Sequence, residues 1–110
     1  MAYDATLAAR IRDLFARRRR AAAEKRMFGG VGFLLDGNLA VGVWQESLVA
    51  RVGPDAADAA ADDPHARPFD PAGRPFRGWL LIDPDGIDAD AALAEWIDRA
   101  TAFADTLPPK

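Results

Sequence analysis

The chain has 110 residues, close to the usual length of one domain, so we expect one hydrophobic core and a single domain over residues 1–110. Its 17 acidic and 14 basic side chains leave a formal charge of -3, which provides no overall field that attracts nucleic acid or an anionic membrane. The absence of cysteine excludes disulfides, thiolate metal sites and thiol nucleophiles. Because no apolar stretch resembles a signal peptide or could span a bilayer, we expect a cytoplasmic protein.

The first segment is typical of an amphipathic helix. Its apolar residues follow the spacing of one helical face, namely Leu7, Ile11, Leu14 and Phe15. Asp4 precedes this pattern and is expected to cap the helix, because its carboxylate can accept backbone N–H groups of the first turn. The helix is predicted to end near the basic run at residues 17–20.

A glycine-rich segment begins at Met27. The glycines at positions 29, 30 and 32 disfavour a helix, by about 1 kcal/mol each relative to alanine. Asp36-Gly37 lies between two apolar runs, which is a strong signal for a two-residue hairpin turn. We therefore predict two antiparallel strands, one on either side of this turn.

The turn also predicts the pairing of these strands. Leu34 would lie opposite Leu39, Gly32 opposite Val41, and Gly30 opposite Val43. Each glycine would then face a bulky neighbour, whose side chain recovers the contact area that the glycine lacks. In this register, packing against bulky neighbours explains why the sequence has glycine at these positions.

The rest of the chain alternates turn signals with apolar runs. The predicted elements are a strand at 48–52, a short alanine-rich helix at 55–62, a proline-limited hairpin or loop at 65–77, a strand at 79–82, and a final helix capped by Asp88 and stopped by Pro108-Pro109. The resulting order of helix, three strands, helix, two strands and helix predicts the α+β class. We expect two layers, an antiparallel sheet of about five strands with the helices on one face.

Several motifs of the chain resemble the TfoX N-terminal domain family. They are Lys25-Arg26-Met27-Phe28-Gly29-Gly30-Val31-Gly32-Phe33, Asp36-Gly37-Asn38, Arg51-Val52-Gly53 and Arg77-Gly78-Trp79. The resemblance extends over nearly the whole chain. It implies an α+β domain with an antiparallel sheet, no enzymatic activity and no cofactor. Family members with a second, helical domain are associated with regulating genes for DNA uptake. This chain ends at Lys110 without such a domain, so we expect a stand-alone N-terminal domain, and a role in competence or transcription regulation stays open.

The sharpest local charge feature is the run Arg17, Arg18, Arg19 and Arg20, with Lys25 and Arg26 close by. A basic segment at a helix end can neutralise phosphates, so one alternative is a small nucleic-acid-binding accessory protein that uses residues 17–26. The other interpretation is that these cations complement the negative end of the helix dipole. We favour the second, because the net charge is negative and no aromatic residues alternate with the arginines to stack on bases.

Catalytic residues, metal ligands and cofactors are not expected. The glycines at 29–32 lack the Lys-Ser/Thr pair of a phosphate-binding loop and precede a hairpin. The chain has one histidine, His65, and one serine, Ser47, which lacks a G-x-S-x-G motif, so a two-histidine metal site and a serine hydrolase are excluded. The acidic pairs Asp83/Asp85 and Asp88/Asp90 are typical of turns and caps.

A second group of arginines is expected to converge in the later half of the chain, namely Arg51, Arg67, Arg74 and Arg77. If Arg51 and Arg77 share the sheet face away from the helices, they could form a site for an anion or an acidic partner. The alternative is an open, solvated sheet face with Arg–Asp pairs. Trp44 and Trp79 on the same face would form an apolar patch typical of partner binding or dimerisation.

These observations predict a non-enzymatic interaction or regulatory module that binds a protein partner, or a second copy of itself, through the uncovered sheet face. The nucleic-acid accessory is the first alternative, and a small-molecule binder, which would need a deep polar pocket, is the second. No membrane partner is expected.

Overall fold

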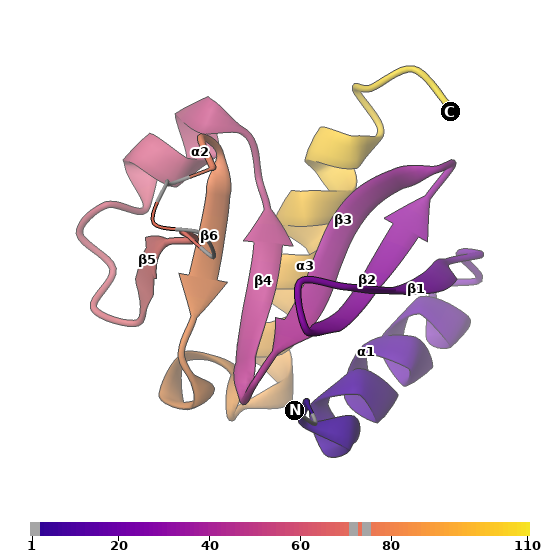
Figure 1. Ribbon diagram of the computed structural model, residues 1–110, viewed down its shortest axis with the longest axis horizontal. Helices are drawn as coiled ribbons and strands as arrows, with labels where there is room; N and C mark the ends of the chain where they lie inside the picture. Colours follow the sequence, from indigo (N-terminus) through magenta and orange to yellow (C-terminus); the bar gives the residue numbers. More distant parts are fainter. Residues whose placement is uncertain (1–2, 71–72, 74–75) are drawn as a thin grey trace.

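The computed structural model describes residues 3–70, 73 and 76–110. The elements along these residues are α1 (Ala5–Arg17), β1 (Ala23–Met27), β2 (Gly30–Leu35), β3 (Asn38–Trp44), β4 (Ser47–Arg51), α2 (Pro54–Ala59), β5 (Ala66–Pro68), β6 (Trp79–Ile82), the 3-10 helix η1 (Pro84–Ile87) and α3 (Asp90–Ala104) (Figure 1). Within the described ranges, no helix combines the length and the apolar character needed to cross a membrane.

The strands form one antiparallel six-stranded sheet in the order β1-β2-β3-β4-β6-β5. The predicted α+β class is confirmed, and the element order agrees with the prediction except for one additional strand and the short helix η1. That strand is β1, which pairs with β2 at the edge of the sheet. Four of its five residues are exposed, so its sequence lacks the alternation of apolar and polar residues that marks a strand.

Both long helices pack on one face of the sheet. Figure 1 shows α3 behind β3 and β4, and α1 along the side where β1 and β2 lie. Asp4 caps α1 as predicted, because its carboxylate accepts the backbone N–H groups of Thr6 and Leu7.

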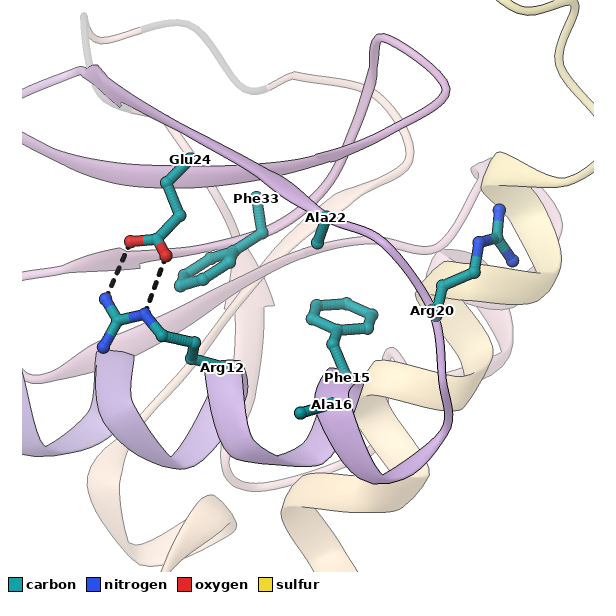
Figure 2. A pocket seen from close by; sticks show the side chains of 7 residues that line it. All are labelled: Arg12, Phe15, Ala16, Arg20, Ala22, Glu24 and Phe33. Carbon is teal, nitrogen blue, oxygen red and sulfur yellow. Dashed lines mark hydrogen bonds and ion pairs between the residues drawn. The ribbon is translucent and has the colours of Figure 1, made fainter.

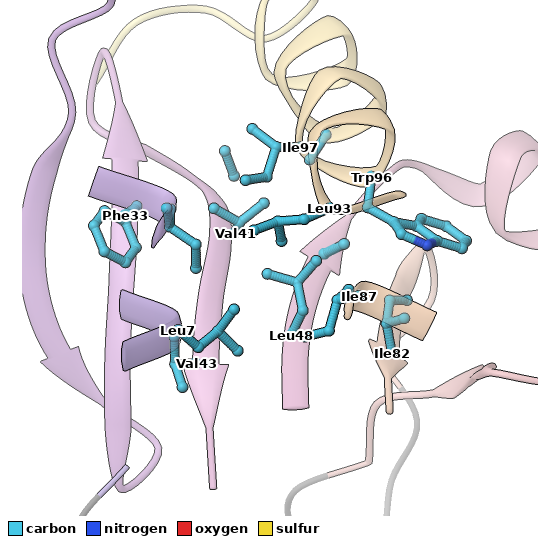
Figure 3. Packing of buried hydrophobic residues seen from close by; sticks show 14 of the residues in the cluster. Leu7, Phe33, Val41, Val43, Leu48, Ile82, Ile87, Leu93, Trp96 and Ile97 are labelled. Carbon is cyan, nitrogen blue, oxygen red and sulfur yellow. The ribbon is translucent and has the colours of Figure 1, made fainter. Parts of the chain in front are cut away.

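The core lies between these helices and the sheet. Figure 3 shows side chains of α3 pointing towards β3 and β4, with Leu7 of α1 beside Val43. The buried side chains of this cluster include Leu7, Ile11, Phe33, Val41, Val43, Leu48, Ile82, Leu93, Trp96 and Ile97. On β4, Leu48 and Ala50 face this core and Val49 faces away.

The predicted register of β2 and β3 is wrong beyond the first pairs. Leu34 does lie opposite Leu39, but Gly32 lies opposite Gly42 and not opposite Val41. The cause is a bulge in β3, where Ala40 is an extra residue between the pairs Leu34–Leu39 and Phe33–Val41. The bulge shifts every later pair by one residue.

The side chains that cover Gly32 and Gly42 therefore do not come from the residues directly opposite them, but from diagonal or neighbouring positions. A Cβ atom added to Gly32 would lie 2.6 Å from Cδ1 of Leu39 and 2.7 Å from Sδ of Met27. A Cβ atom on Gly42 would lie 3.0 Å from Cζ of Phe28. A closer contact for this Cβ atom on Gly42 is the carbonyl oxygen of Val31, 2.7 Å away. Packing still explains these two glycines, and the side chains that cover them come from Leu39, Met27 and Phe28.

The prediction that Asp88 caps the final helix is also wrong. The helix begins at Asp90, its N-cap is Ala89, and no side chain caps it. Asp83 is the residue that caps, because its carboxylate accepts the backbone N–H of Gly86 in η1. The short helix η1, which the sequence did not predict, thus occupies the turn before α3.

Candidate functional site

The sheet face opposite α1 and α3 carries a cluster of aromatic side chains. We call it the aromatic face and define it as Phe28, Trp44, Phe69, Phe76 and Trp79. Phe69 is the centre of the cluster, because its ring centroid lies between 5.4 and 6.3 Å from those of the other four rings. Three of these contacts are edge-to-face, a favoured geometry for aromatic pairs.

The connection from β5 to β6 brings two of these rings onto the sheet. The backbone N–H of Phe69 donates to the carbonyl of Trp79, and the N–H of Phe76 donates to the carbonyl of Phe69. Phe69 is 1% exposed and packs on Val49, whereas Phe76 is 41% exposed. Among the described residues, Phe76 is the one large apolar side chain classed as exposed. The aromatic face thus has a buried centre and an accessible outer ring.

The turn between β1 and β2 places Phe28 on the same face. Phe28 and Gly29 are the central residues of this turn, with φ angles of 43° and 78°. The left-handed conformation costs about 1–2 kcal/mol for a residue with a side chain. The Phe28 ring lies over Gly42 and meets Phe69 edge-on, and these contacts offset the cost. The Met-Phe-Gly-Gly motif therefore positions an aromatic ring.

Trp79 is also the point where the predicted arginines come together. The guanidinium carbon of Arg51 lies 5.6 Å from the Trp79 ring centroid and 5.5 Å from that of Phe103 on α3. Such stacking is a cation–π interaction. Arg67 and Arg77 line a groove together with Trp79. Arg74, the remaining arginine of the predicted group, lies outside the described residues.

These arginines do not form the Arg–Asp pairs that were the alternative prediction. Along the described ranges, Arg51, Arg67 and Arg77 take part in no ion pair within 4.0 Å. The residues outside those ranges are Met1, Ala2, Pro71, Ala72, Arg74 and Pro75, and none of them has a side-chain carboxylate. The cationic groups around Trp79 are therefore available for a ligand or partner.

The basic run at the end of α1 is different, because most of it is paired within the domain. Arg17 pairs with Asp13, and Arg18 forms two hydrogen bonds of 2.9 Å with the carboxylate of Asp98. Arg19, an exposed residue with a φ angle of 53°, has no ion pair in the part of the chain that the structure describes.

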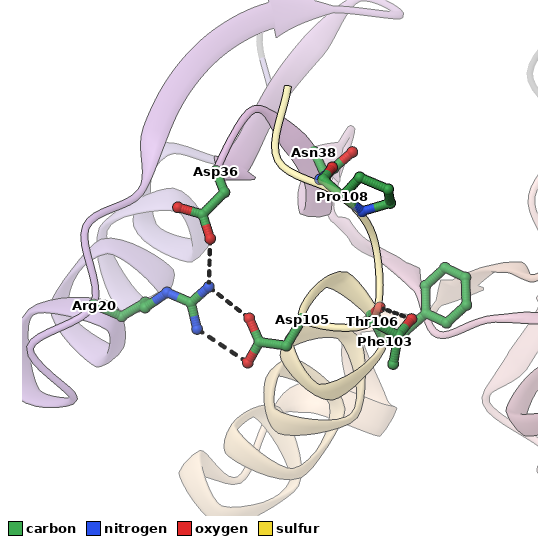
Figure 4. A network of polar contacts seen from close by, with 7 residues as sticks. All are labelled: Arg20, Asp36, Asn38, Phe103, Asp105, Thr106 and Pro108. Carbon is green, nitrogen blue, oxygen red and sulfur yellow. Dashed lines mark hydrogen bonds and ion pairs between the residues drawn. The ribbon is translucent and has the colours of Figure 1, made fainter.

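Arg20 connects three parts of the chain. Figure 4 shows its guanidinium between Asp105, which follows α3, and Asp36 in the turn between β2 and β3. The buried side chain of Asn38 donates to the carbonyl of Pro108, and the Lys110 N–H donates to the carbonyl of Asp36. We call these contacts the terminal latch, because they tie the residues after α3 to the β2–β3 turn.

The shifted pKa values belong to these surface ion pairs. Hydrogen bonds and charge from the paired arginines lower the pKa of Glu24, Asp98 and Asp105, and burial opposes the shift. Perturbed titration at catalytic sites usually comes from burial or from like charges in a cleft. The pKa shifts of these three carboxyl groups instead come from ion pairs that join different segments of the fold.

One such tie borders a small cavity between α1 and β1. Figure 2 shows Arg12 and Glu24 joined by two hydrogen bonds beside the rings of Phe15 and Phe33. Both hydrogen bonds are 2.7 Å long. The cavity has a volume of about 140 Å³. Arg12 and Glu24 neutralise each other, so neither of them provides an unpaired charge to a ligand in this cavity.

Groups suited to metal binding are not gathered in the described residues. No set of three or more His, Asp or Glu side chains there could hold a metal ion. Nδ1 of His65 lies 3.0 Å from Oδ1 of Asp83, the oxygen that also caps η1. This contact holds the half-exposed His65 side chain against the turn before α3.

The comparisons with known proteins give one match. A family model described as the TfoX N-terminal domain matches residues 13–104. The chain belongs to the TfoX N-terminal domain family. The matched segment starts within α1 and ends at the last residue of α3, so it contains the whole sheet and the aromatic face. No curated protein and no solved structure matches the chain.

Sequence reasoning found two members of the aromatic face and missed its centre. Trp44 and Trp79 were expected to form an apolar patch if they shared the uncovered face, and both are half-buried there against Phe69. Phe69 was assigned to a proline-limited hairpin or loop. The signal that could have identified it is the pair Phe69 and Phe76 on either side of a turn-forming segment, directly before a strand.

Proposed function

We propose that this TfoX N-terminal domain is a non-catalytic module that binds a protein partner through its aromatic face. The observation that carries the proposal is the exposure of Phe76, 41%, beside half-buried Trp44 and Trp79. Aromatic side chains are enriched at protein interfaces and dominate the binding energy there. Five of the ten aromatic residues in the chain belong to this one face.

The unpaired arginines indicate where a partner's acidic groups would lie. Arg51 stacks on Trp79, and its planar N–H groups remain able to donate to a carboxylate. An interface with an apolar aromatic centre and cationic groups beside it has the composition expected of a specific contact. We propose that the module regulates its partner in the cytoplasm, by binding rather than by chemistry.

Binding of nucleic acid has less support. Three of the four arginines in the run 17–20 are paired with aspartates of the domain, so their exchange for phosphate contacts would cost existing ion pairs. The aromatic face is on the other side of the sheet from α1 and could not stack bases beside these arginines.

Site-specific photo-crosslinking tests the proposal. A photoreactive amino acid replaces Phe76 in one protein and the exposed Ala9 of α1 in a control. We expect a defined cross-linked protein species from position 76 in native cell extract and none of that size from position 9. Excess wild-type domain should compete it away, whereas the Phe76→Ser variant should compete about tenfold less well. Equal competition by Phe76→Ser, or the same species from both positions, would contradict the proposal.

Light scattering of the purified domain distinguishes a second copy from a different protein. If the partner is a second copy, the average mass rises with concentration and Phe76→Ser removes the rise. If the mass stays that of one chain, the cross-linked species is a different protein. Thermal unfolding of Phe76→Ser checks that this exposed position leaves the fold intact.

A further inference from the structure

A groove of about 350 Å³ lies between the β5–β6 hairpin and the segment formed by α2 and the residues directly after it. Ala57 of α2 forms one wall together with Ala60 and Ala61, which follow the helix. The opposite wall includes Trp79, Leu80 and Pro68, with Phe76 beside them. The volume is at the lower end of the range typical of small-molecule sites, and the lining is mostly apolar, as it is in such sites.

Charges of opposite sign line this groove without forming pairs. Asp58 belongs to α2, whereas Arg67 and Arg77 belong to the hairpin side. Among the described residues, Asp58 has no ion pair within 4.0 Å, and the two arginines have none either. Most arginines of α1, α3 and the segment after α1 form ion pairs with carboxylates of the domain. The presence of unpaired charges of opposite sign is therefore a local property of the groove.

A ligand that satisfies all three groups must carry both charges. A simple carboxylic acid would leave its negative charge close to Asp58, and a simple amine would leave its positive charge close to two guanidiniums. A molecule with a carboxylate, an ammonium group and an apolar body meets each charge with its opposite. The apolar body of such a molecule would also bury the alanine side chains and the Trp79 ring, which is favourable because apolar surface leaves water.

We propose that this groove binds a small zwitterion with an apolar body, such as a free α-amino acid with an aromatic or branched side chain. The carboxylate contacts Arg67 and Arg77, the ammonium group contacts Asp58, and the side chain lies between Trp79 and the alanines 57, 60 and 61. Phe76 and Trp79 line this groove and also belong to the aromatic face, so the small molecule and the protein partner proposed above would share these two residues.

Nuclear magnetic resonance titration of the isotope-labelled domain tests the proposal with three matched probes. L-Phenylalanine carries both charges, 3-phenylpropionate lacks the ammonium group, and phenethylamine lacks the carboxylate. We expect saturable shifts of the Trp79 indole N–H and the amides of residues 57–61. L-Phenylalanine should bind about two- to fivefold more tightly than either analogue, the range for an exposed ionic contact.

Substitutions then assign each charge to its residue. Asp58→Asn should make the domain bind L-phenylalanine and 3-phenylpropionate equally, because the ammonium group loses its partner. Replacement of both Arg67 and Arg77 by Gln should remove the preference over phenethylamine. Arg26→Gln, an exposed cation on β1 at the other edge of the sheet, is the matched control and should change neither ratio.

Several results would overturn the proposal. They are the absence of saturable shifts with L-phenylalanine, shifts confined to residues away from the groove, and equal affinity for all three probes on the wild-type domain. Retention of the wild-type preferences by the Asp58 and arginine variants would also overturn it. A failed titration with successful cross-linking from position 76 would remove this site and leave the proposed partner-binding function in place.

Discussion

Two adjacent glycines of the Met-Phe-Gly-Gly motif should respond very differently to alanine. A Cβ atom on Gly30 would lie 1.8 Å from the carbonyl oxygen of Val43, whereas one on Gly29 would have no neighbour within 4 Å. Real Cβ contacts are essentially never below 3.0 Å, so β2 and β3 would have to separate by about 1.2 Å, the difference between these two distances. Backbone atoms cannot move aside as a side chain does.

The expected losses of stability follow from these contacts. A separation of this size breaks backbone hydrogen bonds at that end of the β2–β3 pair, and overpacking alone costs about 1–3 kcal/mol, so Gly30→Ala should lower the free energy of unfolding by about 3 kcal/mol. Gly29→Ala meets no clash, but the φ angle of 78° costs a residue with a side chain about 1–2 kcal/mol.

Urea unfolding followed by tryptophan fluorescence measures both losses. The useful control is Gly29→Asn, because asparagine tolerates the left-handed conformation better than alanine and should lose less. Equal losses for Gly30→Ala and Gly29→Ala, or a larger loss for Gly29→Ala, would show that the steric reasoning about Gly30 is incorrect.

Three further results are expected. Phe69→Ala should cost about 3–5 kcal/mol in urea unfolding, because the ring is 1% exposed; a loss below about 1 kcal/mol would contradict its central position. The lowered pKa values of Glu24 and Asp98 mean that their pairs stabilise the fold above the ordinary values of 4.5 and 3.8, and that this stability is lost as pH falls below them. Unfolding free energies at pH 7 and pH 3 check this, and Glu24→Gln should reduce the difference. Asn38→Ala should cost about 1–2 kcal/mol by leaving the Pro108 carbonyl without its 2.9 Å donor, and an unchanged melting temperature would refute that.

The sequence predicted the elements that have strong patterns. The helix with Leu7 and Ile11, the Asp36-Gly37 turn and the strand at residues 79–82 all lie where expected, because periodicity and turn chemistry are local properties. β1 was missed because its outward-facing, charged residues have no apolar alternation; only its pairing with β2 makes it a strand. The bulge at Ala40 also left no signal, since alanine suits either a regular strand or a bulge.

The candidate site could be predicted only in part, because it depends on contacts between segments that are far apart in the sequence. Arg17 to Arg20 were correctly assigned to a helix end, but their pairing with Asp98 and Asp105 on the last helix and after it requires the tertiary structure. The groove beside Trp79 likewise needs α2 and the hairpin in place before its lining is defined. The sequence predicted that these charged residues lie at the surface, but it did not predict which residues they contact.

The terminal latch has a consequence for motion. Its contacts join residues 20, 36 and 105, which are far apart in the sequence, and all three side chains are at least partly exposed. Apart from that of Asn38, the side chains of the latch are at least partly exposed, and contacts of this kind open locally without global unfolding. The Lys110 amide should therefore exchange with solvent deuterium much faster than the amides of β3. The residues after α3 would be released and recaptured repeatedly while the sheet beneath them stays closed.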